Sequence, residues 1–366
     1  MKFTCERSVL LKEITIAQEI IATKNAISIL SNIYIEAKDD MLYIKATDLK
    51  VNFETQVPVT VAEPGVTTVF GEKFLGILNS YPDGEVEFEE GNGKMVIKSK
   101  KINHRSSLKI IDSEKYPEFS VSTADIFEFS IKDFKEMILQ TVFAVSDDET
   151  RYFMNGVYFE KNGSKITMVA TDGRRLAFIS KEAGSGVKEF SPVIIPPKIL
   201  NIIMKRAGDE GLISISVTDK TIFVQFGSYK LSSVLIEGQF PNYKRVIPEK
   251  QSFSFTVNRT EMLDALRRVS LMVEQKSHRV YLGVETGHVL VYTEENELGE
   301  SEGEIACKYE GEKVAIALNY RYIEEPFKVI TGDEINIKFT EPNKAITISP
   351  VPETDFFHII MPMQLD

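Results

Sequence analysis

Hydrophobic and polar positions along this chain follow a pattern that recurs three times. In each third, a short β-rich run leads into a stretch with apolar residues at helical spacing. Phe3, Phe129 and Phe255 stand at the start of the three copies and lie 126 residues apart. A fixed period of this length indicates three copies of one domain rather than a solenoid of small repeats.

Each copy predicts two helices. The first helices are expected over residues 8–22, 132–145 and 259–273, and Ser8 is the expected N-cap of the first. Shorter second helices are expected over residues 71–80, 197–207 and 319–327. Pro197 suits a helix start because its ring fixes φ near the helical value.

Alternating or β-rich runs bounded by turn residues lie between these helices. They predict strands over residues 41–46, 85–88, 95–98, 157–159, 166–169, 213–217, 222–226 and 335–339. Asn92-Gly93 and Asn162-Gly163 are typical of hairpin turns. We therefore predict an α+β fold of three pseudo-repeated domains, each with two helices against antiparallel sheet, over residues 1–121, 122–246 and 247–366.

Composition agrees with a folded, soluble chain of three domains of about 122 residues. Hydrophobic residues make up 43% and charged residues 27%, and no run of 18 apolar residues predicts a membrane span. The N-terminus lacks the apolar segment of a signal peptide. Cys5 and Cys307 lie in different copies, which argues against a disulfide framework and predicts a cytoplasmic protein.

Sequence signatures of catalysis are missing. There is no phosphate-binding Gly-x-x-x-x-Gly-Lys-Ser/Thr loop and no Gly-x-Ser-x-Gly elbow, and the four histidines are scattered. Asp147-Asp148-Glu149 lacks the glycine-centred loop and distal glutamate of a calcium site, so we interpret it as a solvated acidic loop. We expect neither an enzyme nor a cofactor or metal.

Charge is unevenly distributed. The net charge of −11 argues against a nucleic-acid partner unless the bases are segregated. Residues 94–109 contain six bases and no acid, whereas residues 294–304 contain six acids and no base. These blocks are either solvated faces or complementary edges, through which two chains would join head to tail and close a ring. Bases on the predicted helices would face phosphates if the helices line a pore; ordinary amphipathic helices explain them equally well.

Five motifs spread from end to end resemble the bacterial sliding-clamp family, the β subunit of DNA polymerase III. They are Met1-Lys2-Phe3-Thr4, Arg151-Tyr-Phe-Met-Asn-Gly156, Ala170-Thr-Asp-Gly-Arg-Arg-Leu176, Phe240-Pro-Asn-Tyr-Lys-Arg245 and Met361-Pro-Met363. The resemblance implies a ring-shaped, head-to-tail homodimer whose helices surround duplex DNA without regard to sequence. Such a clamp is not an enzyme; it tethers the replicative polymerase and works in the cytoplasm at the nucleoid.

The resemblance also implies a groove between the second and third domains and the C-terminus. In the family it takes Gln-Leu-x-Leu-Phe-like peptides from the DNA polymerase III catalytic subunit, the clamp loader and other replication and repair proteins. The apolar C-terminal run either completes a core or belongs to this groove, and Arg175 and Arg245 would frame it or bond peptide carbonyls. Carried over by motif, the groove residues are Met154, Gly156, Thr171, Gly173, Arg174, Arg175, Leu176, Pro241, Arg245, Val246, Ile359, Met361, Pro362 and Met363.

Two further sets follow from the implied ring. The bases expected to face DNA are Lys24, Lys73, Lys132, Lys198, Lys205, Arg206, Arg259 and Arg267. The residues expected at the dimer interface are Lys101, Ile102, Arg105, Leu108, Ile110, Leu271, Met272, Glu297, Glu300 and Glu302.

A few positions depart from the family pattern. Arg174 stands where histidine is frequent, Gln364 where arginine is usual, and Ser106 where the dimer edge often carries an aromatic residue. Glu325-Pro326 should shorten or distort the last helix, because proline lacks an amide proton and clashes with the preceding turn. Two other classes are an interaction scaffold of the same fold that never encircles DNA, and a nuclease or polymerase-associated enzyme. The enzyme would need clustered carboxylates, which the sequence lacks.

Overall fold

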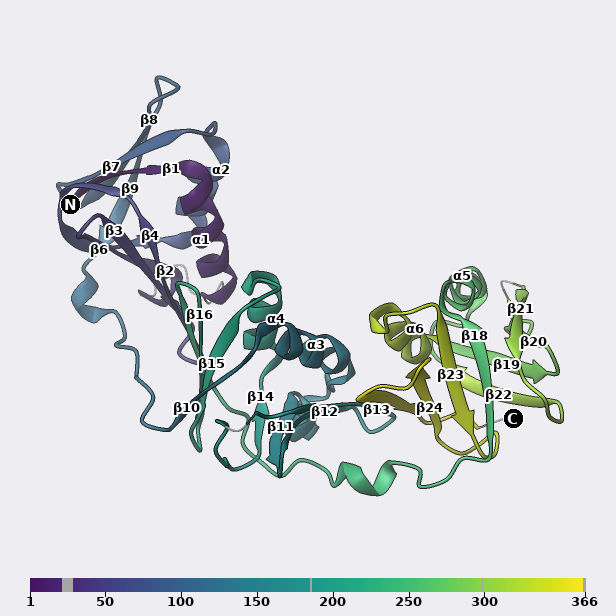
Figure 1. Cartoon of the computed structure of the whole chain (residues 1–366). Coiled ribbons are helices and arrows are strands. Elements are labelled where there is room, and N and C mark those ends of the chain that lie inside the picture. Colours follow the sequence, from purple (N-terminus) through teal and green to yellow (C-terminus); the bar gives the residue numbers. More distant parts are fainter. Residues whose placement is uncertain (22–28, 185, 298, 365–366) are drawn as a thin grey trace. The chain divides into compact units, whose positions relative to one another are not determined.

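The computed structural model describes residues 1–21, 29–184, 186–297 and 299–364. The chain forms two compact units, which are described separately (Figure 1). The first unit contains Met1–Ile131 and Asn201–Leu235, and the second contains Lys132–Leu200 and Ile236–Asp366. The predicted middle domain thus contributes to both units, and the three predicted domain limits stay a prediction.

Three helices that directly follow a strand support the threefold repeat and correct its period. They are α1 (Arg7–Ile20), α3 (Ile131–Thr141) and α5 (Arg259–Val269), after β1 (Lys2–Glu6), β10 (Ile126–Ser130) and β18 (Phe253–Asn258). Phe3, Phe127 and Phe255 each lie four residues before the first helical residue. The repeat length is therefore 124 and then 128 residues, and Phe129 takes the place of Cys5. The equal spacing of 126 misled because both Phe127 and Phe129 are buried.

The first helices also differ from prediction at their ends. α1 begins at Arg7 after Glu6, which makes no side-chain cap, so Ser8 is not the N-cap. The Arg7 Nε donates to the Leu78 carbonyl at 2.7 Å and fixes the helix start instead. The 3-10 turns η3 (Val142–Ala144) and η6 (Ser270–Met272) replace the predicted last turns of the second and third copies. The predicted end of the first helix lies outside the described residues.

The second helices are α2 (Gly71–Ser80), α4 (Pro197–Arg206) and α6 (Tyr320–Val329), each ten residues long. Pro326 lies inside α6, so the predicted shortening of this helix is wrong. The Asn319 Oδ1 accepts from the Arg321 amide at 3.0 Å and caps the helix start. Pro326 and Phe327 are buried, and this packing offsets the amide hydrogen bond that proline cannot make.

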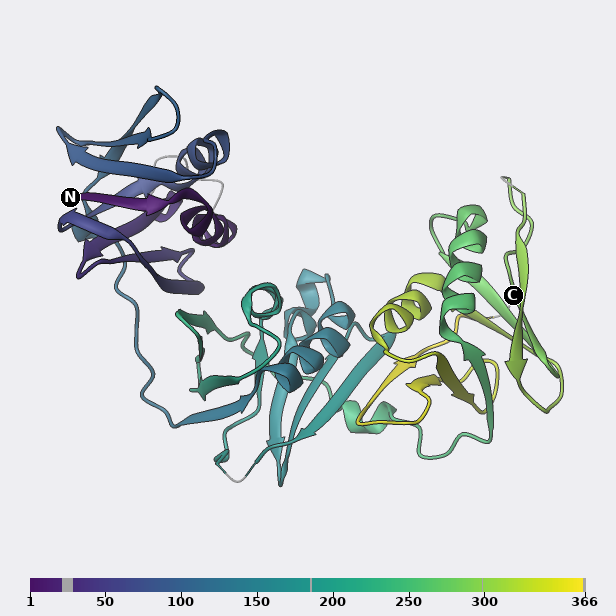
Figure 2. The same ribbon diagram turned by 45° about the horizontal axis from the view of Figure 1, so that its top comes forward.

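The described part of the first unit holds a 13-stranded antiparallel sheet, in the order β10-β15-β16-β17-β4-β3-β2-β6-β9-β8-β7-β1-β5. Figures 1 and 2 show α1 and α2 side by side against these strands. The strands not yet given are β2 (Asn32–Lys38), β3 (Met41–Thr47), β4 (Val51–Pro58), β5 (Thr60–Glu63), β6 (Gly65–Phe70), β7 (Glu85–Gly91), β8 (Lys94–Ser99), β9 (Arg105–Ile111), β15 (Leu212–Val217), β16 (Thr221–Phe226) and β17 (Tyr229–Val234).

The second unit holds, within the residues described, a 12-stranded antiparallel sheet in the order β14-β11-β12-β13-β25-β24-β23-β18-β21-β20-β19-β22. Every strand run predicted from sequence falls inside an observed strand. The bounds are β11 (Val157–Asn162), β12 (Lys165–Thr171), β13 (Arg175–Glu182), β14 (Val193–Ile195), β19 (Arg279–Glu285), β20 (His288–Tyr292), β21 (Glu302–Lys308), β22 (Val314–Asn319), β23 (Glu334–Phe339), β24 (Ile346–Pro350) and β25 (Phe356–Ile360).

One strand pair in each unit joins neighbouring repeats, and we call these pairs joints. In the first unit β17 pairs with β4, and Lys230 lies opposite Glu54 with 3.1 Å between Nζ and Oε1. In the second unit β25 pairs with β13, and the rings of Phe357 and Phe178 stack with centroids 4.8 Å apart. The backbone ladder thus continues from one repeat into the next, whatever the side chains.

No helix among the residues that the structure describes is long and apolar enough to cross a membrane. Those same residues do not gather three or more His, Cys, Asp or Glu side chains where they would hold a metal ion.

A buried polar pair lies beside the second joint. The Gln140 Nε2 donates to the Val329 carbonyl at 2.9 Å, which leaves its Oε1 to accept from the His358 Nε2 at 3.0 Å. His358 is 1% exposed, and burial, with the nearby positive charge of Arg175, lowers its pKa to about 3. The folded protein therefore keeps this imidazole neutral.

Acid should destabilise the protein through His358. An unfolded histidine has a pKa near 6.5, so below that pH the unfolded state binds a proton that the folded state does not. Stability conferred by the neutral imidazole is full above pH 6.5, and about 2 kcal/mol of it should be lost between pH 7 and pH 5. Urea unfolding of the parent and of His358→Gln should show a smaller pH dependence in the variant. His104→Gln, at an exposed histidine, is the matched control; equal pH slopes in parent and His358→Gln would contradict the assignment.

Candidate functional site

The structure gathers the predicted groove residues in the second unit. They come from the 3-10 segment η4 (Glu149–Met154) and the turn after it, the end of β12, the turn from β12 into β13, the start of β13, the segment that leads into and includes η5 (Tyr243–Val246), and β25 with the chain end after it. Two backbone hydrogen bonds hold the chain end in place. The Met361 amide donates to the Arg174 carbonyl, and the Met363 amide to the Ala317 carbonyl, both at 2.8 Å.

The apolar members of the predicted set divide into two classes. Met154, Leu176 and Ile359 are at most 5% exposed. Leu176 and Ile359 belong to a buried cluster with Val169, Ile194, Phe240 and Tyr243. Val246 and Met361, in contrast, are 52% and 46% exposed. The first class is buried in the core, whereas the second class is open to solvent.

The remaining predicted groove residues lie around these two classes. Arg174, Gly173 and Arg245 are exposed, Pro241, Pro362 and Met363 are half-buried, and Thr171 and Gly156 are buried. A Cβ on Gly156 would come within 2.7 Å of the Ile195 carbonyl oxygen, so no larger residue fits there. Gly156 therefore serves packing beneath the site.

A tight turn orients the two arginines after β12. The Asp172 Oδ1 accepts from the amides of Arg174 and Arg175 at 2.8 and 3.1 Å. The Thr171 hydroxyl donates to the Arg175 carbonyl at 2.6 Å and accepts from the Gly173 amide at 3.1 Å. Gly173 has a φ of +88°, which disfavours residues with a side chain. This turn directs Arg174 outward and Arg175 inward.

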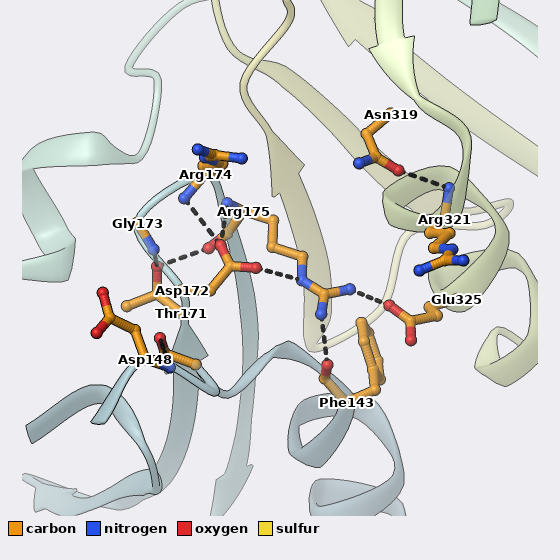
Figure 3. Close-up of polar contacts among 11 residues, drawn as sticks. Phe143, Asp148, Thr171, Asp172, Gly173, Arg174, Arg175, Asn319, Arg321 and Glu325 are labelled. Atoms are coloured by element: carbon orange, nitrogen blue, oxygen red, sulfur yellow. Dashed lines mark hydrogen bonds and ion pairs between the residues drawn. The ribbon is translucent and has the colours of Figure 1, made fainter. Parts of the chain in front are cut away.

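Arg175 joins elements of two repeats (Figure 3). Its Nε donates to Asp172 Oδ2 at 3.0 Å, its Nη2 donates to the Phe143 carbonyl at 2.7 Å, and its Nη1 contacts the Glu325 carboxylate. The guanidinium also lies 4.6 Å from the ring centre of Tyr322. These contacts engage each nitrogen of the guanidinium and hold it between two repeats. That Arg175 bonds peptide carbonyls stays a prediction.

The tyrosine of this cluster is held in its neutral form. Burial, reinforced by the negative charge of Asp172, raises the pKa of Tyr322. At the neighbouring segment η4, hydrogen bonds from Thr150 and Arg151 lower the pKa of Asp148 to about 2. Asp148 thereby caps η4 through the Thr150 amide, 2.9 Å away. The acidic loop around Asp148 is thus a structural cap.

Sequence reasoning missed Phe143, Tyr322 and Glu325 as parts of this site. Nothing in the sequence around Tyr322 marked it as a partner of Arg175. Phe143 contributes a main-chain carbonyl, which no side-chain pattern reveals. Glu325 attracted attention only as the neighbour of Pro326.

The bases predicted to face DNA have different surroundings. Lys132 and Arg267 are exposed on α3 and α5. Lys73 and Lys205 are exposed but pair with Glu72 and Glu19, each at 2.9 Å. Lys198 and Arg206 are half-buried on α4, and Lys24 lies outside the described residues. Arg259 donates to the carbonyls of Gly332 and Phe327 at 2.9 and 3.3 Å, a role like that of Arg7 at the end of α2.

Charge on the helices is opposite to that of the whole chain. The exposed side chains of α1 to α6, the α-helices of the described residues, include four acids and eight bases. The bases are Lys12, Lys73, Lys132, Lys205, Arg267, Arg268, Arg321 and Lys328. A chain of net charge −11 therefore carries a net positive charge on its exposed helical residues.

Most residues predicted for the dimer interface lie at the surface of the chain. Leu271 and Ile102 are 76% and 42% exposed, which is high for apolar side chains. The charged members, Lys101, Arg105, Glu297, Glu300 and Glu302, are exposed, and Leu108, Ile110 and Met272 are half-buried.

Comparison with known proteins identifies this fold. Family models of the DNA polymerase III beta subunit match the chain in succession: the N-terminal domain over residues 1–120, the central domain over 128–242 and the C-terminal domain over 244–364. The beta sliding clamp of Treponema pallidum is 46% identical over 373 residues, and that of Escherichia coli is 26% identical over 370, with each chain fully covered.

Solved structures give the same result. A DnaN sliding clamp from Bartonella birtlesii bound to griselimycin is 29% identical with a TM-score of 0.94, and the clamp of Bacillus subtilis is 26% identical with a TM-score of 0.92. Both comparisons cover the whole of each chain. The fold is that of a DNA clamp. The chain belongs to the DNA polymerase III beta subunit family. It acts as a DNA polymerase sliding clamp in replication. Its partners are DNA and the polymerase, and it forms a dimer.

Removing the Arg175 side chain should destabilise the second unit. In Arg175→Ala the Glu325 and Asp172 carboxylates and the Phe143 carbonyl lose a donor, and we expect a loss of about 2 kcal/mol in the free energy of unfolding. Urea denaturation measures this loss. Arg245→Ala removes an exposed arginine of the same site and should change stability by less than about 0.5 kcal/mol. Equal free energies of unfolding for Arg175→Ala and the parent would contradict this stabilising role of Arg175.

Proposed function

We propose that this clamp is a non-catalytic, cofactor-free processivity factor that holds its partners by short peptides at the site around Val246 and Met361. The partners are the DNA polymerase III catalytic subunit, the clamp loader and other replication and repair proteins, each through a Gln-Leu-x-Leu-Phe-like segment. Two chains form a ring around duplex DNA, in the cytoplasm at the nucleoid.

The observation that carries the peptide site is the pair of exposed apolar side chains on a rigid base. Val246 ends η5 and Met361 belongs to a chain end held by two backbone hydrogen bonds. Tyr243 at the start of η5 and Ile359, two residues before Met361, belong to one buried cluster. A site formed in advance loses little entropy on binding, and burying leucine and phenylalanine of a peptide on methionine and valine supplies the affinity.

The arginines of the site have separate roles in this proposal. Arg174 and Arg245 are exposed and available to the peptide's carbonyls and its acidic neighbours. Arg175 fixes the position of the turn that carries Arg174, through Asp172. Arg175 therefore positions the site.

Support for DNA in the ring comes from the charge on the helices. The excess of bases over acids among exposed helical residues provides weak phosphate contacts without base recognition. Enclosure rather than affinity then keeps the clamp on DNA, so the ring slides. The acidic remainder of the chain disfavours contacts with DNA elsewhere.

Peptide binding should depend on the exposed apolar class. We expect a labelled Gln-Leu-Asp-Leu-Phe peptide to bind the full chain and to lose binding when residues 361–366 are removed. The double variant Val246→Ala with Met361→Ala should raise the dissociation constant by at least about 30-fold, because the loss of even one anchor of this kind costs about 2 kcal/mol. Fluorescence anisotropy measures both effects.

Controls separate this loss from unfolding. Leu212→Ala removes a leucine that is 57% exposed in the first unit and should bind the peptide as the parent does. Leu176→Ala is unsuitable, since it opens a cavity in the core at a cost of about 2–5 kcal/mol. Unchanged affinity of the truncated chain would place the peptide site elsewhere.

DNA should be held by topology, with helical bases adding a salt-dependent attraction. Loaded onto a closed circular plasmid, the clamp should persist and then leave when the plasmid is cut. The variant Lys132→Glu with Arg267→Glu should stay on the closed circle but show a shallower salt dependence, by about 0.9 in the logarithmic slope for each phosphate that it no longer neutralises. Lys220→Glu, at an exposed lysine off the helices, is the control. Retention on cut plasmid would contradict encirclement and favour a scaffold.

A further inference from the structure

The first joint carries a copy of the turn that orients the arginines at the second joint. In the turn between β3 and β4, the Asp48 Oδ1 accepts from the amides of Lys50 and Val51 at 2.9 and 2.7 Å. The Thr47 hydroxyl accepts from the Leu49 amide at 2.9 Å. Each of these three hydrogen bonds has a counterpart in the turn after β12. The two joints can therefore be compared residue by residue.

The strand that lies beside this turn is repeated as well. The Val234 amide donates to the Lys50 carbonyl at 2.8 Å, as the Met361 amide does to the Arg174 carbonyl. Val234 is 45% exposed and Met361 is 46% exposed. Val234 is therefore the counterpart, at the first joint, of the exposed methionine of the proposed peptide site.

Leu49 takes the place of Gly173 in the copied turn. Its φ is +73°, a left-handed value that glycine adopts freely and that disfavours a residue with a side chain. The leucine side chain is 60% exposed, so burial in the core does not offset this strain. Together with Val234, which bonds to the next residue of the turn, Leu49 presents an apolar pair to solvent. A leucine in a strained and exposed position indicates a contact outside the chain.

A cavity of about 680 Å³ lies at the same joint. Along β17 it is lined by Ser232 and Lys230, which stand two and four residues before Val234. Side chains two residues apart on a strand project from the same face, so the apolar pair and the cavity share one face of the joint. Residues 118–122, in the segment before β10, form a wall of the cavity.

The side chains across the two joints explain why the space is open at the first. At the second joint the two cross-strand pairs on this face are large and apolar: Leu176 with Ile359, and Phe178 with Phe357. At the first joint the corresponding pairs are polar: Asn52 with Ser232, and Glu54 with Lys230. The short amide and hydroxyl pair leaves room above the strands, and the charged pair lines that room.

The charged end of the cavity has two bases for one acid on its floor. The Glu54 carboxylate lies between two ammonium groups, with Oε1 3.1 Å from the Lys230 Nζ and Oε2 3.5 Å from the Lys45 Nζ. The Lys45 Nζ also lies 5.7 Å from the ring centre of Phe119 in the wall. Glu118, the other acid among the lining residues, is exposed on the wall. The floor can therefore accept one further carboxylate.

We propose that the first joint holds a second peptide site, which takes an extended segment with an apolar and an acidic residue four positions apart. The apolar side chain rests on Leu49 and Val234, and the carboxylate reaches Lys230 and Lys45. Val234 and Lys230 are separated by about 13 Å along β17, and an extended peptide covers this distance in four residues. The choice of a peptide as occupant rests on the proposed function, because it transfers the occupant of the second joint to its counterpart.

The second peptide site selects partners of different chemistry from those of the first. A Gln-Leu-x-Leu-Phe segment would bring an apolar side chain over the charged pair Glu54 and Lys230, which would lose water without gaining a partner. An acidic residue at that place gains an ion pair instead. The same backbone frame thus serves two classes of peptide.

Fluorescence anisotropy of a labelled Leu-Ser-Gly-Ser-Asp peptide tests the site in the full chain. We expect saturable binding that removal of residues 361–366 leaves unchanged. Leu49→Gly should raise the dissociation constant at least about fivefold, because it removes an apolar anchor. It should not lower the free energy of unfolding, because glycine suits this φ. Val66→Ala, at a valine that is 39% exposed on β6, is the control and should bind as the parent does.

Exchange of charge tests the acidic half of the motif. Lys230→Glu should raise the dissociation constant of the Leu-Ser-Gly-Ser-Asp peptide about tenfold. The same variant should bind Leu-Ser-Gly-Ser-Lys more tightly than the parent does, a gain that loss of structure would not produce. Lys220→Glu, at an exposed lysine outside the cavity lining, should change neither affinity.

The outcomes separate this site from the proposed one. Binding of Leu-Ser-Gly-Ser-Asp that the truncation abolishes places that peptide at the second joint and overturns the second peptide site. Absence of saturable binding, or equal affinity of the parent for the acidic and the basic peptide, overturns it too. A changed sedimentation coefficient of Leu49→Gly with unchanged peptide affinity assigns the apolar pair to a contact between chains instead. The Gln-Leu-Asp-Leu-Phe peptide tests the proposed function independently, so either site can fail alone.

Discussion

Antiparallel pairing of strands from neighbouring repeats is the interaction on which this clamp depends. A strand edge carries N–H and C=O groups that must find partners, and here β4 meets β17 and β13 meets β25. The ladder uses only backbone atoms, so the side chains across it are free to differ. One joint carries Lys230 with Glu54, and the other stacks Phe357 on Phe178.

The proposed peptide site follows from the second joint. Where β25 runs beside β13, the chain end beyond β25 lies next to the Arg174 turn, and Arg175 reaches α6 through Glu325. The exposed Met361 is thereby fixed to a base that two repeats build together. Binding energy need not be spent on ordering the chain end, which favours a site shared by many partners with short, simple peptides.

Local patterns in the sequence predicted the strands and the second helices well, because turn residues and apolar spacing determine them. The prediction that Ser8 caps the first helix was wrong, because β1 runs directly into α1. There the Arg7 side chain donates a hydrogen bond to a carbonyl 71 residues away. The prediction that Pro326 would shorten the last helix was wrong, because tertiary packing stabilises α6. Residue type alone could not separate buried Leu176 from exposed Met361, nor show that the nitrogens of Arg175 are occupied, since both depend on which strands become neighbours.

The same antiparallel ladder at both joints creates a problem of strand choice during folding. The edge of β17 would fit the backbone of β13 as well as that of β4. Lys230 set against Phe178 would lose water without gaining an opposite charge, whereas Phe357 in the same place stacks. The differing side chains of the two joints therefore favour the correct strand pairing over the exchanged one.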